Sequence, residues 1–343
     1  MCRMFSSVWP ARTQHQKAIM SFLLTRRTAL AAAASSAAGA FAQSPQPGAT
    51  NTFVVPMSAG SVADLLARKM GMQLADATGE AWVIENVPGA SGALAARQVL
   101  RKSADGRTLL WGYSGLICAT PLLAKPALEF DPVTDFTPVC TMSASPMVLF
   151  AGKDFPANDL EELRAFARTQ AEPLSYIAND IGSANHVAAE SLLQTLGIRG
   201  LHVPYRNTMQ AYIDVAEGRV QLGIQAFGLM GSQLQGANRA KVLAVLANKP
   251  LAAEPRYRTV PAQGFGPFDI QGWFGVFAPR GTPEARMADL ERLMSAVLHD
   301  KAYSEAIVQS GQEVAFRGRA QTRRFVDEEA RRYRSLLQKL KLI

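Results

Sequence analysis

The stretch FVVPMSAGSVADLLARKMGM, residues 53–72, sets the pattern for the rest of the chain. A short apolar strand leads into the loop Pro56–Ser61, and apolar residues at helical spacing follow from Val62 onward. The start of a helix leaves backbone N–H groups without partners, and the helix dipole favours negative charge there. The stretch therefore predicts an anion-binding cradle. An ordinary strand-to-helix connection is the plainer alternative.

A second stretch repeats this layout further along the chain. Residues 174–178 are expected to form a strand, 179–185 a polar loop that contains Gly182, and the residues from about His186 a helix. If the two loops face each other across a cleft, each takes one carboxylate through backbone N–H groups and serine hydroxyls. The pair would bind a compact diacid.

The amino-terminal residues 1–42 differ from the rest and predict an export signal. Arg26-Arg27 precede the small and apolar run of residues 30–41, and an A-x-A cleavage site ends at Ala42. The run is too short and too rich in serine and glycine for a membrane-spanning helix. Both the twin-arginine and the Sec route remain open, and Met20 is an alternative start to Met1. We expect the mature protein in the periplasm.

Removal of this signal changes the charge argument. The formal net charge of the whole chain is +8, but the signal holds basic residues and no acids, which leaves the mature chain near +3. Without a dense basic and aromatic patch, this balance gives no support for nucleic-acid binding. Cys118 and Cys140 remain after cleavage, and they are either a disulfide or two buried thiols.

From Asn51 onward, strands and helices alternate, which predicts an α/β fold with mainly parallel sheets flanked by helices. The mature chain of about 300 residues favours two lobes over one.

Motifs of catalysis and cofactor binding are missing from the sequence. Residues 112–115 break the G-x-S-x-G pattern, and neither G-x-G-x-x-G nor a Walker loop occurs. The mature histidines, His186, His202 and His299, have no partners at the spacing of metal ligands. We therefore expect no enzyme activity, no cofactor and no metal. An exported hydrolase acting through Ser114 is the least favoured alternative.

Six motifs together resemble one family. They are VVPMSAGSVAD (54–64), ENVPGASG (85–92), ADGRTLLWG (104–112), FDPVTDFTPV (130–139), LHVPYRN (201–207) and WFGVFAPRGTP (273–283). In this order, the motifs resemble those of the tripartite tricarboxylate transporter receptors, the Bug-type periplasmic solute-binding proteins, over nearly the whole mature chain.

The resemblance implies a two-lobed periplasmic binding protein of type II-like architecture that closes on its ligand like a hinged trap. Lobe 1 would comprise residues 43–145 plus 264–343, and lobe 2 residues 146–263. The receptor would be a monomer that captures a small organic acid or amino acid and delivers it to the membrane permease subunits of a tripartite tricarboxylate-type transporter. A sensory adaptor for a membrane histidine kinase is the alternative.

The family's two carboxylate-binding loops map onto the two repeated stretches. The implied ligand-binding residues are Ser58, Gly60, Ser61, Val62, Ala63, Asp64, Asp180, Gly182, Ser183, His186, Tyr205 and Gln225. Three features depart from the family pattern: the first loop has one glycine where two are usual, Asp180 stands where glycine is frequent, and Gln225 replaces a common aspartate. Asp180 would repel a second carboxylate or suit an amine. These departures affect the identity of the ligand more than the fold.

Overall fold

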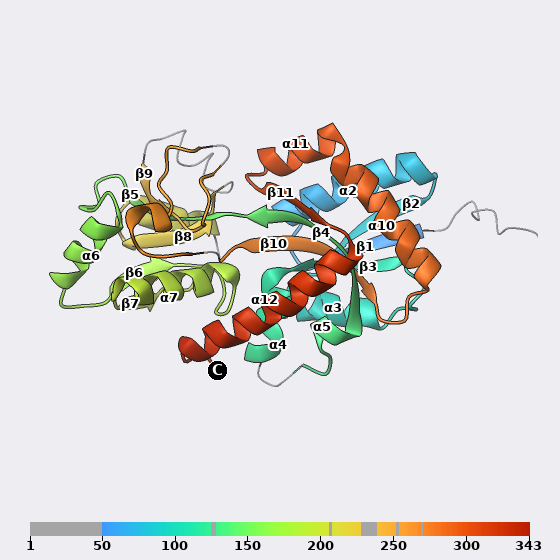
Figure 1. The fold of residues 1–343 in the computed structure, drawn as a ribbon, viewed down its shortest axis with the longest axis horizontal. Helices are drawn as coiled ribbons and strands as arrows, with labels where there is room; N and C mark the ends of the chain where they lie inside the picture. Colours follow the sequence, from blue (N-terminus) through green and yellow to red (C-terminus); the bar gives the residue numbers. More distant parts are fainter. Residues whose placement is uncertain (1–49, 125–127, 206–207, 228–238, 252–253, 269) are drawn as a thin grey trace, which may run out of the picture. The chain divides into compact units, whose positions relative to one another are not determined.

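Two separate β-sheets organise the chain in the computed structural model (Figure 1). The structure describes residues 50–343 except 125–127, 206–207, 228–238, 252–253 and 269. The predicted export signal, residues 1–42, lies outside the described residues.

The first sheet has six strands in the order β11-β4-β10-β3-β1-β2. Their bounds are β1 Thr50–Val55, β2 Ala81–Asn86, β3 Thr108–Tyr113, β4 Phe136–Ser145, β10 Gly272–Pro279 and β11 Glu313–Arg317. β1 pairs in parallel with β2 and β3, whereas β10 runs antiparallel to both β3 and β4, and β11 runs antiparallel to β4.

The second sheet has five strands in the order β7-β6-β8-β5-β9. Their bounds are β5 Met147–Gly152, β6 Leu174–Ile177, β7 Gly200–His202, β8 Leu222–Ala226 and β9 Ala240–Val245. β6 is parallel to β7 and β8, and β5 is antiparallel to β8 and β9. The chain enters this sheet directly after Ser145 and returns to the first at Gly272.

The α/β class is confirmed, but the sheets are mixed rather than mainly parallel. Strands joined by a helix, such as β1 and β2, are parallel, as the sequence predicts. β4 keeps the direction of β1, β2 and β3 and leads into the second sheet. β10 brings the chain back and therefore runs the opposite way, as does β11. The assignment of residues to two lobes remains a prediction.

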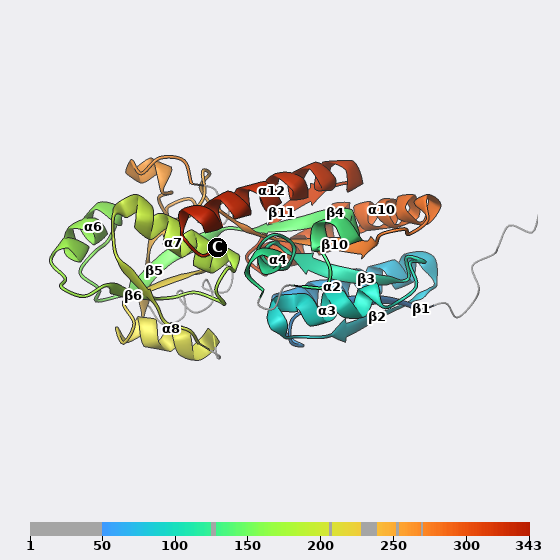
Figure 2. The same ribbon diagram turned by 90° about the horizontal axis from the view of Figure 1, so that it is seen from below.

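Helices cover the sheets. They are α2 Val62–Thr78, α3 Ala93–Leu100, α4 Thr120–Leu123, α5 Pro132–Asp135, α6 Leu160–Arg168, α7 Ala184–Leu196, α8 Thr208–Ala216, α10 Glu284–His299, α11 Lys301–Gln309 and α12 Arg319–Lys339, with a π-helix, η2, at Gly115–Ala119. α2 and α10 contact each other, and α12 contacts β4 and η2. Both views place the carboxyl end of α12 beside α7, which it also contacts (Figures 1 and 2).

Among the described residues, buried apolar side chains form three clusters around these elements. One cluster includes Leu116–Ala119 of the η2 region, Tyr333 of α12 and Val187 of α7, so burial continues from one sheet's helices to the other's. Each fully buried large side chain contributes about 1.5–3 kcal/mol of folding free energy. Within the described residues, no helix is long and apolar enough to cross a membrane.

The two mature cysteines are free and buried, so they do not form a disulfide. Burial raises the pKa of the Cys140 thiol to about 12 and that of Cys118 well above its usual value. Both thiols are therefore protonated and packed in the core, which agrees with one of the two alternatives left open by the sequence.

Candidate functional site

The first loop, Ser58–Asp64, joins β1 to α2 and is closed by hydrogen bonds within itself. The Ser61 N–H donates to the Ser58 carbonyl at 3.2 Å, and Gly60, at φ +81°, donates its N–H to Asp64 Oδ2 at 2.9 Å. Ser61 is the N-cap of α2, and its Oγ accepts from the Asp64 N–H at 3.3 Å. Ser61 thus caps the helix, while Asp64 reaches back past the N-cap to the N–H of Gly60, one residue before the position used in a capping box.

Asp64 holds this loop in place. Its carboxylate is buried and forms an ion pair with Arg68 at 2.9 Å, and Arg68 also donates to Asn86 Oδ1 at 3.1 Å. Burial acts to raise the pKa of Asp64, but the hydrogen bonds from Arg68 and Gly60 outweigh it and hold the pKa below its ordinary value. The Asp64 carboxylate is therefore ionised, and it bonds to Arg68 and Gly60 within the loop rather than to a ligand.

The second loop, Asp180–His186, repeats the same pattern bond for bond. The Ser183 N–H donates to the Asp180 carbonyl at 2.9 Å, and Gly182, at φ +82°, donates its N–H to His186 Nδ1 at 3.3 Å. Ser183 is the N-cap of α7, and its Oγ accepts from the His186 N–H at 3.2 Å. His186 therefore has the position in this loop that Asp64 has in the first.

Each loop leaves a pair of backbone donors unused. The N–H groups of Val62 and Ala63 at the start of α2, and of Ala184 and Asn185 at the start of α7, have no acceptor within the described residues. These donors lie at the positive end of a helix dipole, where an anion binds favourably. Within the described residues, no hydrogen bond or ion pair joins one loop directly to the other.

His186 is a buried, neutral histidine. Its ring centroid lies 4.9 Å from that of His202, and the ring of Tyr176 lies 6.5 Å away. Burial, together with the charge that His202 would carry, lowers the pKa of His186 to about 4. Because Nδ1 accepts from Gly182, the single proton of the neutral ring resides on Nε2.

Gln225 is buried and connects β8 to the start of α7. Its Oε1 accepts from Asn185 Nδ2 at 2.6 Å and from the Ala226 N–H at 2.9 Å, and its Nε2 donates to Asn179 Oδ1 at 3.3 Å. The sequence pointed to Gln225 but missed Asn179 and Asn185. Both belong to the polar loop expected at 179–185, but the sequence did not indicate that they contact Gln225.

Tyr205 lies in the segment after β7 and packs against a cluster of buried residues that includes Tyr212 and Val215 of α8. Its hydroxyl donates to Asp214 of α8, and this hydrogen bond, with some burial, raises the pKa of Tyr205. Asp214 also pairs with Arg219 at 2.7 Å. Tyr205 is therefore anchored to α8, and its contact with a ligand remains a prediction.

Elements of the first sheet lie against the second loop. A Cβ added at Gly182 would overlap Leu123 Cδ1 and would lie 3.7 Å from the Ala119 Cβ, and one added at Gly115 would lie 3.8 Å from the Ser183 Cα. The charge of Asp180 adds to burial in raising the pKa of Tyr113, at the end of β3. The helix-start loop of one sheet thus meets the η2–α4 region of the other.

A left-handed turn adjoins this region and was missed by the sequence reading. Ala90 and Ser91 have φ of 48° and 49°, and the Ser91 carbonyl accepts from Thr120 Oγ1 at 3.2 Å. Non-glycine residues with positive φ are sparse and cluster at functional sites. The only signal in the sequence was the pair of glycines in PGASG, at Gly89 and Gly92.

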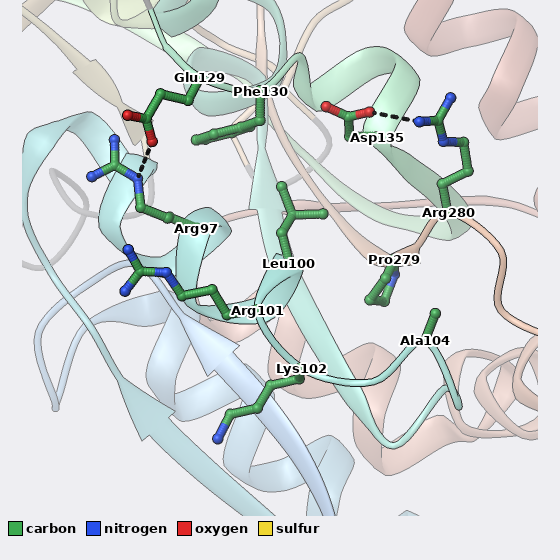
Figure 3. A pocket seen from close by; sticks show the side chains of 10 residues that line it. All are labelled: Arg97, Leu100, Arg101, Lys102, Ala104, Glu129, Phe130, Asp135, Pro279 and Arg280. Carbon is green, nitrogen blue, oxygen red and sulfur yellow. Dashed lines mark ion pairs between the residues drawn. The ribbon is translucent and has the colours of Figure 1, made fainter.

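Two cavities lie apart from these loops. One, of about 450 Å³, is lined by Arg97, Leu100, Arg101, Lys102, Ala104, Glu129, Phe130, Asp135, Pro279 and Arg280 (Figure 3). Arg97 pairs with Glu129 at 3.9 Å at one side of the cavity, and Arg280 pairs with Asp135 at 3.3 Å at another (Figure 3). Neither this cavity nor the second includes any of the predicted ligand-binding residues. Within the described residues, no group of three or more histidine, cysteine or carboxylate side chains could hold a metal ion.

Comparison with known proteins identifies the family. A family model described as "Tripartite tricarboxylate transporter family receptor" matches residues 66–342. The chain belongs to this receptor family. The resemblance drawn from the six motifs is thereby confirmed.

Relatives and solved structures agree with this membership. A UPF0065 protein of Bordetella pertussis is 29% identical over 94% of this chain and 98% of the relative, and BugT of the same species is 27% identical over 82% and 86%. The structure of R. palustris Rpa4515 with adipate is 29% identical, with a TM-score of 0.78 over 87% of this chain and 99% of that one. MatC of Rhodopseudomonas palustris with bound malate is 29% identical, with a TM-score of 0.73 over 84% and 98%. The two-lobed periplasmic-binding-protein fold is therefore confirmed.

Proposed function

We propose that this receptor captures a small carboxylated solute at the two helix-start loops and delivers it to a membrane permease. The observation that carries the proposal is the repeated loop, with a glycine at φ near +80°, a capping serine and two unused N–H groups in each copy. Backbone donors at a helix start bind a carboxylate without any charged side chain. Two related receptors hold adipate and malate, both of which are dicarboxylates.

Asp180 adjusts the choice of ligand. Its side chain is exposed at the start of the second loop, close enough to Tyr113 to raise the pKa of that phenol. A carboxylate at this position repels a second carboxylate and attracts an amine. We therefore expect Asp180 to weaken, without abolishing, carboxylate binding at the second loop, so that amino acids or monocarboxylates compete well with diacids.

Delivery to a permease rests on family membership, and so does location in the periplasm. The family's described role is that of a transporter receptor. The sequence of residues 1–42 supports export, with the route left open.

A thermal-shift screen tests the proposal. Purified chain from about Gln43 onward would be heated with a panel containing malate, adipate, citrate, aspartate, glutamate and benzoate, with their uncharged amides as controls. A ligand at 100 times its dissociation constant adds about 2.7 kcal/mol to the free energy of unfolding, so a specific acid raises the melting temperature by several degrees. No shift with any acid, or equal shifts with acids and amides, would contradict carboxylate capture.

A further inference from the structure

The two sheets share one arrangement of strands around their helix-start loops. In the first sheet β1 lies between β2 and β3 and is parallel to both, and in the second β6 lies between β7 and β8 in the same way. Each time, the chain passes from the central strand through one helix to one neighbour, and through a second helix back to the other. Open α/β sheets bind ligands at such a reversal of strand order, outside the carboxyl ends of the strands.

The repeated loops fix which residues of the two central strands correspond. Gly60 and Gly182 have the same place in their loops, with φ of +81° and +82°. Six residues before these glycines stand Val54 in β1 and Tyr176 in β6, and each is the last residue but one of its strand. Val54 and Tyr176 are therefore equivalent positions, and so are their partners in the strands on the returning side.

This equivalence identifies a residue that the sequence reading did not select. The partner of the first position is Leu110 of β3, and the partner of the second is Leu222 of β8. Three residues further along, β3 ends at Tyr113 and β8 reaches Gln225. Tyr113 is therefore the first sheet's counterpart of Gln225, which was expected to bind the ligand.

Two glycines hold the ring of Tyr113 next to the second loop. A Cβ added at Gly92 would lie 3.2 Å from Cε1 of this ring, and one added at Gly115 would lie 2.9 Å from Cε2, so the glycines approach opposite edges. The Cβ at Gly115 would also lie 3.8 Å from the Cα of Ser183, the N-cap of α7. The ring thus lies between the left-handed turn after β2 and the start of η2, beside the second loop.

The hydroxyl group of Tyr113 is free to meet a ligand. Within the described residues it has no hydrogen-bond partner, whereas the amide of Gln225 is bonded to Asn179 and Asn185. Burial, and then the charge of Asp180, raises the pKa of Tyr113 above its ordinary value. The phenol is therefore neutral and keeps a proton to donate. Once a solute excludes water from the site, this donor needs an acceptor.

We infer that Tyr113 is a specificity-determining residue, whose hydroxyl donates a hydrogen bond to the carboxylate of a dicarboxylic solute held at the start of α7. The unused N–H groups of Ala184 and Asn185 bind the same carboxylate. A hydrogen bond to an ionised oxygen is about twice as strong as one between neutral groups, so it offsets repulsion by Asp180. This inference rests on the proposed function, because it names the residue through which the receptor accepts a second carboxylate.

Calorimetric titration of Tyr113→Phe with matched acids tests the inference. The substitution keeps the ring between Gly92 and Gly115 and removes the hydroxyl group. The probes are malate and adipate, each compared with its monoamide, which has the same length and one carboxylate fewer. Tyr113→Phe is expected to bind the diacids about tenfold more weakly than wild type and to bind the monoamides within about twofold of wild type.

A second tyrosine gives the matched control. Tyr257 lies between β9 and β10, and its hydroxyl accepts from Arg256 at 3.3 Å. Tyr257→Phe should leave the affinities for both kinds of probe unchanged. Tyr113→Phe should also keep the melting temperature of the ligand-free wild type, because no hydrogen bond within the described residues is lost.

The outcomes separate this inference from the proposed function. Unchanged diacid affinity in Tyr113→Phe, or an equal loss for diacids and monoamides, would overturn the role of the hydroxyl and leave carboxylate capture standing. So would a wild-type chain that binds benzoate but none of the dicarboxylates in the thermal-shift panel. No thermal shift with any acid in wild type would overturn the proposed function, and the role of Tyr113 with it.

Discussion

Gly182 and Gly60 offer a matched pair for testing how the second loop is held. They have φ of +82° and +81° and the same place in the repeated loop, so an alanine at either position has the same backbone cost of about 1–2 kcal/mol. They differ in their surroundings, because a Cβ at Gly60 meets nothing within 4 Å, whereas one at Gly182 overlaps Leu123 Cδ1. Gly182→Ala therefore carries an additional overpacking cost of about 1–3 kcal/mol.

Urea unfolding of the purified chain measures this difference. Gly60→Ala should lower the free energy of unfolding by about 1–2 kcal/mol and Gly182→Ala by about 2–5 kcal/mol, with unchanged denaturant slopes. In a Leu123→Ala background, which removes the obstructing methyl groups, the cost of Gly182→Ala should fall to that of Gly60→Ala. Equal costs for the two single variants, or no relief by Leu123→Ala, would refute the packing of this loop against α4.

Three further predictions follow from the same loops. The pKa of His186 is about 4 in the folded chain and about 6.5 in the unfolded chain. Its contribution to stability is therefore complete above pH 6.5 and is lost as the pH falls towards 4. Between pH 7 and pH 5, the free energy of unfolding should drop by about 2 kcal/mol more in wild type than in His186→Gln. A drop of the same size in both proteins would contradict a neutral, buried His186. Asp64→Asn, which removes the charge that pairs with Arg68, should cost about 1–3 kcal/mol in thermal unfolding, and a cost near zero would show that the carboxylate does not hold the loop. Asp180→Asn should tighten malate or adipate binding about three- to tenfold by calorimetry, and weaker binding would show that Asp180 helps rather than repels a diacid.

Local patterns in the sequence were enough to predict the elements that carry the site. The helices from Val62 and from the 179–185 loop follow glycine and serine signals within a few residues, and the structure places capping serines at Ser61 and Ser183. The same locality explains why the two loops could be recognised as copies of one another.

Long-range arrangements were not available from local patterns. β11 pairs with β4, about 170 residues away in the chain, and β10 enters between β4 and β3, so the antiparallel half of the first sheet could not be seen. The hydrogen bond between Asn185 and Gln225 spans 40 residues and was missed for the same reason. The left-handed Ala90 and Ser91 escaped notice because neither residue type signals a positive φ.

The central claim is that solute carboxylates bind to the unused N–H groups at the starts of α2 and α7. Proline at the first helical position removes one such N–H, and a helix tolerates it there because its φ is already helical. Ser61 and Ser183, with ψ of 162° and 159°, have the extended conformation that a following proline requires.

The decisive measurement is calorimetric titration of Val62→Pro and Ala184→Pro with the acid that gives the largest thermal shift. Val62→Ala, which keeps the N–H group, is the control. Each proline variant should remain as stable as wild type and bind the acid at least about tenfold more weakly, as expected when one hydrogen bond to a charged group is lost. Unchanged affinity in both folded proline variants would contradict carboxylate binding at these helix starts.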